Sequence, residues 1–210
     1  MNKIEYIDII VKNGNIAAEK ADCIVVPQFS NCASYGGVGY AIEAAGMTAG
    51  LDEYDKIAQK KPLKYGDSMI TASGKPGVKL AHVATAGANE KEQPMAVVKS
   101  IVGTLVSANQ QKLQYIAIPE LGTGIIGNLT QEQSAKAIFN AVYEFAKANP
   151  ASSIKQVSLV IFRGSTEPAL KVLTDKTYMK LPANMIGGKE FDMGVWLYGM
   201  CNNGIGKSYH

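Results

Sequence analysis

Residues 116–127 read Ile-Ala-Ile-Pro-Glu-Leu-Gly-Thr-Gly-Ile-Ile-Gly, an apolar run that stops in a glycine-rich loop. Glycine has no Cβ, so these glycines allow backbone angles that turn several N–H groups toward one point. Just beyond the loop, Thr130 and Gln133 have the spacing of a capping box, which predicts that a helix begins there. Backbone N–H groups near a helix N-terminus attract anions. The stretch therefore predicts a site for a phosphate or diphosphate.

A second glycine-rich segment precedes a helix earlier in the chain. Residues 22–26 (Asp-Cys-Ile-Val-Val) are almost continuously apolar, which is typical of a strand covered on both faces. Residues 36–39 (Gly-Gly-Val-Gly) then lead into a small-residue helix that is expected to end at Gly46. In an α/β sheet the ligand crevice lies beyond the carboxyl ends of the strands. Both glycine loops occupy that position, so we expect them to face one ligand from opposite sides.

Strands and helices alternate through most of the chain, which predicts one sheet with helices on both faces. Residues 66–74 and 78–85 are expected to pair as a hairpin, and Thr48 is expected to cap the helix that follows it. We place the main domain at residues 1–176. From Thr177 the periodicity fails, so residues 177–210 are expected to form a C-terminal extension. Its aromatic residues, Trp196 and Tyr198, suggest packing on its own domain or on a partner chain.

Composition excludes several classes of protein. The 210 residues are 47% hydrophobic and 19% charged, with a formal net charge of +3, which is typical of a globular domain. No basic tract supports nucleic-acid binding by charge, and no apolar run approaches the roughly 18 to 20 residues of a membrane helix. The N-terminus does not resemble a signal peptide, so we expect a cytoplasmic protein. Three cysteines without C-x-x-C spacing indicate neither a disulfide framework nor a metal site, and no cofactor is expected.

In their order along the chain, these motifs resemble the macrodomain, the module that binds ADP-ribose. The resemblance covers residues 4–175 and implies an α/β fold, a three-layer α/β/α sandwich with a mixed central β-sheet. The matching pieces are Asn13-Gly14-Asn15-Ile16, the strand 21–26, Ser34-Tyr35-Gly36-Gly37-Val38 with the helix after it, the strand 66–74, and the loop from Pro119 to Gly127.

The resemblance also implies which residues bind the ligand. Asn15 stands where the family has an adenine-reading Asp; its side-chain carbonyl still accepts a hydrogen bond, weaker by about 1 kcal/mol. Ile126 replaces an aromatic that packs against the ribose, and Phe162 falls where an aromatic stacks on adenine. Ser34 and Tyr35 replace glycines and narrow the first loop. The implied ligand-binding residues are Asn15, Ile16, Ser34, Tyr35, Gly36, Gly37, Val38, Gly122, Thr123, Gly124, Ile125, Ile126, Gly127 and Phe162.

The catalytic residues of hydrolytic macrodomains do not carry over. One type uses an Asn directly after the first buried strand, where residues 26–29 here read Val-Pro-Gln-Phe. A second type uses a strand Lys and a loop Asp, where this chain has residues 83–86 and Ile126. No catalytic residue is assigned, and binding of ADP-ribose or a related nucleotide without turnover is the leading hypothesis. The alternative enzyme is an atypical hydrolase of ADP-ribosylated protein or O-acetyl-ADP-ribose, with a base among Asn31, Asp67 and Glu120.

Two further hypotheses remain open. Residues 122–127 can be read as a dinucleotide fingerprint with Arg163 meeting a 2′-phosphate, although the helix expected from Thr130 starts too late for it. Alternatively, the nucleotide pocket is vestigial and residues 177–210 bind a protein partner or a second copy of the chain. ADP-ribosylated protein is a separate candidate partner, not assigned to residues 177–210. His82 is expected to be a buried, hydrogen-bonded imidazole, and Cys32 an inert thiol.

Overall fold

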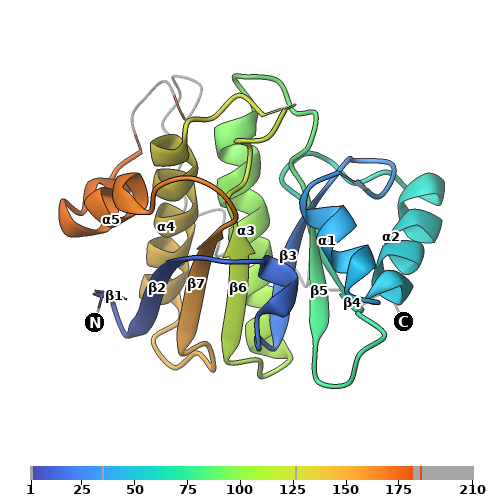
Figure 1. Ribbon diagram of the computed structural model, residues 1–210. Coiled ribbons are helices and arrows are strands. Elements are labelled where there is room, and N and C mark those ends of the chain that lie inside the picture. The colour runs from blue at the N-terminus through green and yellow to red at the C-terminus, as the bar shows by residue number, and fades with distance from the viewer. Residues whose placement is uncertain (1, 35, 126, 182–184, 186–210) are drawn as a thin grey trace.

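The computed structural model describes residues 2–34, 36–125, 127–181 and 185. Within them the chain forms a seven-stranded sheet in the order β1-β2-β7-β6-β3-β5-β4 (Figure 1). The strands are β1 (Asn2–Ile4), β2 (Ile7–Asn13), β3 (Cys23–Gln28), β4 (Ser68–Ala72), β5 (Lys79–Ala84), β6 (Tyr115–Pro119) and β7 (Gln156–Ile161). The edge strands β1 and β4 run antiparallel to their neighbours, whereas the five strands between them are parallel.

Helices cover both faces of this sheet. Figure 1 shows α1 and α2 on one face and α3 and α4 on the other. The helices are α1 (Val38–Ala44), α2 (Thr48–Lys60), α3 (Gln93–Gln110), α4 (Gln131–Ala148) and α5 (Glu167–Thr174), with 3-10 turns η1 (Ile16–Ala18) and η2 (Thr177–Met179). The predicted three-layer α/β/α sandwich with a mixed sheet is therefore confirmed. None of the described helices is long and apolar enough to cross a bilayer.

The interior strand β3 contributes to the cores on both faces. Cys23 and Val25 pack with α3 and α4, whereas Ile24 and Val26 face the core under α1 and α2. All four are at most 1% exposed, as expected for the almost continuous apolar run that encodes them. Burial on both faces fixes β3, and with it the start of the glycine loop that follows.

The helix starts show where local sequence determines structure. Thr130 Oγ1 accepts from Gln133 N at 3.2 Å, and Gln133 Oε1 accepts from Thr130 N at 2.9 Å, so the predicted capping box is present. The predicted cap at Thr48 is wrong, because Thr48 is the first residue of α2 and the buried Met47 precedes it without a capping hydrogen bond. The predicted hairpin is confirmed as β4 and β5. The short β1 was not predicted.

The start of the expected C-terminal extension packs on the main domain. Tyr178 in η2 is 4% exposed, and Asn140 Nδ2 of α4 donates to its carbonyl at 2.8 Å. The rest of that segment, including Trp196 and Tyr198, lies outside the described residues apart from Lys180, Leu181 and Met185. A domain boundary at residue 176 stays a prediction.

Candidate functional site

Four neighbouring parallel strands end at one edge of the sheet (Figure 1). In sheet order these are β2, β7, β6 and β3, and Asn13 at the end of β2 pairs with Ile161 at the end of β7. Asn15 follows β2 and Phe162 follows β7, while the two glycine loops follow β6 and β3. We call residues 28–38 the first loop and residues 120–130 the second loop. The topology thus brings the predicted site segments to the same edge.

Helix α2 holds the start of the first loop. The hydroxyl of Tyr54 donates to the carbonyl of Phe29, and the carboxylate of Asp55 accepts from the N–H of Ala33 at 2.5 Å. Tyr54 is fully buried, and burial raises the pKa of its hydroxyl, so the group stays protonated and can donate. The loop backbone is therefore fixed at two points before its glycines begin.

A buried chain of polar side chains fixes the loop at a third point. Gln28 Oε1 accepts from Ser34 N at 2.5 Å, so Gln28 Nε2 donates to His82 Nδ1 at 2.9 Å. His82 Nε2 then carries the proton and donates to Thr71 Oγ1 at 2.8 Å. Burial lowers the pKa of His82 to about 3, which keeps the ring neutral. The satisfied imidazole was predicted; the role of Gln28 was not, because no local signal links residue 28 to residue 82.

The glycines of the first loop leave backbone donors unpaired. Among the described residues, none accepts a hydrogen bond from the three successive N–H groups of residues 36–38. Gly37 has a φ of 52°, which favours glycine, and a Cβ on Gly39 would lie 1.6 Å from the Ser34 carbonyl oxygen. The N–H of Ser34 is already engaged by Gln28, so it does not add a fourth donor. Tyr35 lies outside the described residues.

Two side chains from the helix layer anchor the second loop. Ser134 Oγ of α4 accepts from Leu121 N at 3.0 Å, and Gln93 Oε1 of α3 accepts from Asn128 N at 2.6 Å. Gln93 is 1% exposed, and its Nε2 also donates to a carbonyl at the end of β5. Neither anchor was predicted, because both join residues far apart in sequence.

Between these anchors the second loop folds onto itself. A Cβ on Gly127 would lie 2.0 Å from the Gly122 carbonyl oxygen, and Gly122 has a φ of 75°. Leu129 N donates to that same oxygen at 2.9 Å. Elsewhere in the loop, no described residue accepts from the four successive N–H groups of residues 122–125. This range includes the predicted Thr123 and the fully exposed Ile125, whereas the predicted Ile126 lies outside the described residues.

The ends of β2 and β7 supply one polar and one aromatic side chain. Asn15 is exposed, and its Oδ1 accepts from Ala17 N at 3.0 Å, which caps η1. Ile16 is 5% exposed, so its side chain offers a ligand little surface. Phe162 is 67% exposed, and the guanidinium of Arg163 lies 5.2 Å from its ring centroid. An aromatic ring so exposed at a strand end offers a stacking surface.

The candidate bases are dispersed. Glu120 directly follows β6 at the edge that carries the loops, and burial raises the pKa of its carboxyl, opposed by a hydrogen bond with Gln131. Asn31 is exposed in the first loop. Asp67 directly precedes β4, where its carbonyl accepts from Ala84 N at the carboxyl end of β5, and its Oδ2 accepts from Lys64 N at 3.0 Å. No group of His, Cys, Asp and Glu side chains in the described part of the chain could hold a metal ion.

A sequence model of the family described as Macro domain matches residues 27–138, more than half of the chain. The chain belongs to the macro domain family. The match begins in β3 and ends in α4, so it includes both glycine loops of this macro domain. The predicted family resemblance is confirmed.

Relatives of this macro domain include proteins of different sizes. An uncharacterized protein of Aquifex aeolicus is 30% identical over 66% of this chain and 82% of its own. The ADP-ribose glycohydrolase of Archaeoglobus fulgidus is 29% identical over 81% of this chain and 94% of its own. Human protein mono-ADP-ribosyltransferase PARP14 is 31% identical over 76% of this chain. The chain spans only 8% of PARP14 and 26% of an uncharacterized Thermotoga maritima relative.

Solved macrodomains share the fold. A mutant of the Oceanobacillus iheyensis macrodomain aligns with a TM-score of 0.72 at 21% identity, over 84% of this chain and 98% of its own. The Trypanosoma brucei macrodomain in complex with ADP-ribose aligns with a TM-score of 0.65 at 18% identity, over 78% of this chain and 68% of its own. These alignments support the three-layer architecture.

Proposed function

We propose that this macro domain binds ADP-ribose, with the diphosphate held by the two glycine loops. The observation that supports this most directly is that no described residue accepts from the N–H groups of residues 36–38 and 122–125. They follow β3 and β6, which are adjacent parallel strands. Backbone N–H groups without a protein acceptor bind phosphate oxygens well, because the donors are already ordered.

The strand order suggests how the nucleotide lies. Asn15 and Phe162 follow β2 and β7, which both lie on the same side of β6, away from β3. A diphosphate at the loops after β6 and β3 therefore directs adenine toward Asn15 and Phe162. Phe162 would stack on the base, and the free lone pair of Asn15 Oδ1 would accept from its exocyclic amine. The distal ribose would point toward β5.

Binding without efficient turnover is the simpler function. Gln28 lies in the segment where one type of hydrolase has its Asn, but its side chain is fully buried and both its ends are engaged by Ser34 and His82. Residues 83–86, where the other type has its Lys, are Val-Ala-Thr-Ala. One observation favours a hydrolase: Glu120 lies at the site edge, and its pKa is raised in the direction that suits a general base.

Calorimetry with ADP-ribose tests the binding site. We expect a micromolar dissociation constant for the natural chain and no detectable binding for Gly37→Glu, because a carboxylate would enter the anion site. Gly77→Glu is the matched control: both glycines have positive φ and no atom within 4 Å of a built Cβ, but Gly77 lies in the β4–β5 turn. Equal affinity in Gly37→Glu and the natural chain would contradict the proposal.

A turnover assay distinguishes a protein that only binds ADP-ribose from one that hydrolyses its derivatives. Incubation with O-acetyl-ADP-ribose and with ADP-ribosylated protein is expected to release no product above background. Turnover that Glu120→Gln abolishes, while ADP-ribose binding persists, would instead establish the hydrolase.

A further inference from the structure

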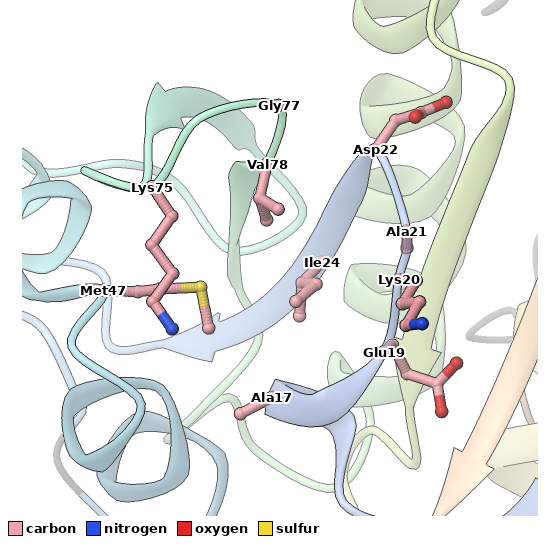
Figure 2. A pocket seen from close by; sticks show the side chains of 10 residues that line it. All are labelled: Ala17, Glu19, Lys20, Ala21, Asp22, Ile24, Met47, Lys75, Gly77 and Val78. Carbon is pink, nitrogen blue, oxygen red and sulfur yellow. The ribbon is translucent and has the colours of Figure 1, made fainter.

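A cavity of about 340 Å³ lies at the opposite end of the sheet from the two loops (Figure 2). It opens beside η1, the amino end of β3 and the turn between β4 and β5, on the face that α1 and α2 cover. None of the predicted ADP-ribose-binding residues lines it. A ligand in this cavity would therefore not compete with one at the loops.

The centre of the cavity is apolar. The half-buried Ala17 of η1 and Val78, just before β5, provide its accessible apolar surface, above the almost fully buried Ile24 and Met47. Figure 2 shows Ala17 and Val78 on either side of Ile24. Such a surface favours a hydrocarbon part of a ligand over a sugar or other hydrated group.

Two carboxylates border the cavity, but both are engaged elsewhere. Asp22 Oδ2 accepts from the backbone N–H of Gln114 at 2.7 Å and from that of Tyr115 at 2.9 Å. Glu19 forms an ion pair with Lys12 at 2.7 Å and accepts from the Tyr115 hydroxyl at 2.7 Å. Figure 2 shows both carboxylates directed away from the apolar centre. They therefore do little to repel an anion inside.

Two lysines border the cavity without such partners. Lys20 and Lys75 are exposed, and neither forms an ion pair or hydrogen bond through its ammonium with a described residue. Lys20 follows η1 and Lys75 lies in the β4–β5 turn, so they come from opposite walls. In Figure 2 they flank Ile24 on either side. The cavity thus has a cation at each side of an apolar centre.

We propose that this cavity binds a small organic dianion whose two carboxylates are separated by an apolar spacer. Each carboxylate pairs with one lysine, and the spacer covers Ala17 and Val78. The volume lies at the lower end of the roughly 300–1,000 Å³ typical of ligand pockets, so the ligand is small. The proposal is independent of ADP-ribose binding, because it uses no residue of either loop.

Suberate, an eight-carbon dicarboxylate, is the probe. In ¹H–¹⁵N NMR titrations of the full chain, we expect saturable shifts of the backbone amides of Ala17, Ala21 and Gly77, which line the cavity. Suberate should bind at least about threefold more tightly than octanoate, which has one carboxylate, since each partly exposed ion pair contributes modestly. Octanediol should bind more weakly still. Equal affinities for suberate and octanoate, or shifts confined to the glycine loops, would overturn the proposal.

Variants that remove one charge each test whether Lys20 and Lys75 bind the carboxylates. Lys20→Gln and Lys75→Gln should each lower suberate affinity to that of octanoate and leave the thermal midpoint unchanged, because both side chains are exposed. Lys171→Gln on α5 removes an equally exposed charge far from the cavity and should bind suberate normally. A succinate and adipate series then sets the spacer length. No loss in either cavity variant, or the same loss in Lys171→Gln, would refute the assignment.

Discussion

The two glycine loops lie side by side at one edge of the sheet but are stabilised differently. The first loop is tied down before its glycines, by Gln28 and by two side chains of α2. Its Gly36 and Gly37 then have no neighbour within 4 Å of a built Cβ. The second loop is tied at both ends, and its own backbone packs where Gly122 meets Gly127. Side chains from the helices thus hold both loops, but only the second loop also requires a glycine where its own backbone packs, at Gly127.

This difference separates two causes of lost binding. A side chain added at Gly36 meets no atom within 4 Å and occupies ligand space, whereas one added at Gly127 displaces backbone. Conversely, the first loop is sensitive to changes far away in sequence, at residues that touch no ligand. The variants below test this contrast, from the largest expected effect to the smallest.

Gly127→Ala should have the largest effect. Its Cβ would lie 2.0 Å from the Gly122 carbonyl oxygen, so the second loop must open. We expect a loss of about 2 kcal/mol in the free energy of unfolding and a loss of ADP-ribose affinity of about a hundredfold. Calorimetry and chemical denaturation measure both.

Gly124→Ala is the control in the same loop, because a Cβ there meets no atom within 4 Å and its φ is not positive. It should retain stability and most of its affinity. If the two alanine variants behave alike, the self-packing of this loop does not explain its glycines.

Gln28→Leu tests the first loop through a residue that touches no ligand. The substitution leaves Ser34 N and His82 Nδ1 without a partner in a buried site, which costs about 2 kcal/mol of stability. ADP-ribose affinity should fall about tenfold, since the loop loses one of its three fixed points. Gln28→Glu can still accept from Ser34 but has no donor for His82 Nδ1 and buries a charge, so it should restore affinity only in part. Unchanged affinity in Gln28→Leu would show that α2 alone holds the loop.

The buried imidazole predicts a pH dependence of stability. Burial lowers the pKa of His82 to about 3, whereas an unfolded chain has a His pKa of about 6.5. Between these values the unfolded state binds a proton that the folded state does not. Its contribution to stability is thus complete above about pH 6.5 and falls as the pH decreases, by up to about 1.4 kcal/mol per pH unit.

Denaturation curves between about pH 7 and pH 4 should show a shallower decline in His82→Gln than in the natural chain. Comparing the slopes of unfolding free energy against pH cancels the part of the destabilisation by the substitution that does not depend on pH. Identical slopes would mean that His82 is protonated in the folded protein or that its neighbours relax around it.

Asn15→Asp should have the smallest effect and the opposite sign. The carboxylate can still accept from Ala17 N, so the cap of η1 is retained. A charged acceptor strengthens the bond to the adenine amine by about 1 kcal/mol, so ADP-ribose affinity should rise about fivefold. Calorimetry with ADP-ribose and with ribose 5-phosphate as the base-free control checks that the gain requires adenine.

Much of the fold was predictable because its signals are local. The apolar run of β3, the capping box of Thr130 and Gln133, and the hairpin of β4 and β5 each reside in a few consecutive residues. The wrong cap at Thr48 arose where tertiary packing prevailed: burial of Met47 sets the start of α2. The short β1 carries too few residues to show a period.

The site was predictable only in part. Glycine spacing located both loops, because positive φ and close backbone approach leave a mark in sequence. The residues that hold the loops leave no such mark in the sequence. Gln28 is hydrogen-bonded to His82 and Gln93 to Asn128, and only the folded chain brings these pairs together. In the sequence, a Gln with a buried structural role on a strand cannot be distinguished from any other polar residue that interrupts an apolar run.

The fixed tautomer of His82 makes this ring a built-in spectroscopic reporter. Its Nε2 proton is shielded from solvent and hydrogen-bonded to Thr71. Its Nδ1 accepts from Gln28, whose amide oxygen holds the first loop at Ser34. The ¹⁵N chemical shifts of the imidazole therefore change when the hydrogen bond between Gln28 and His82 weakens. An observer can follow the loop during nucleotide titration without attaching a label near it.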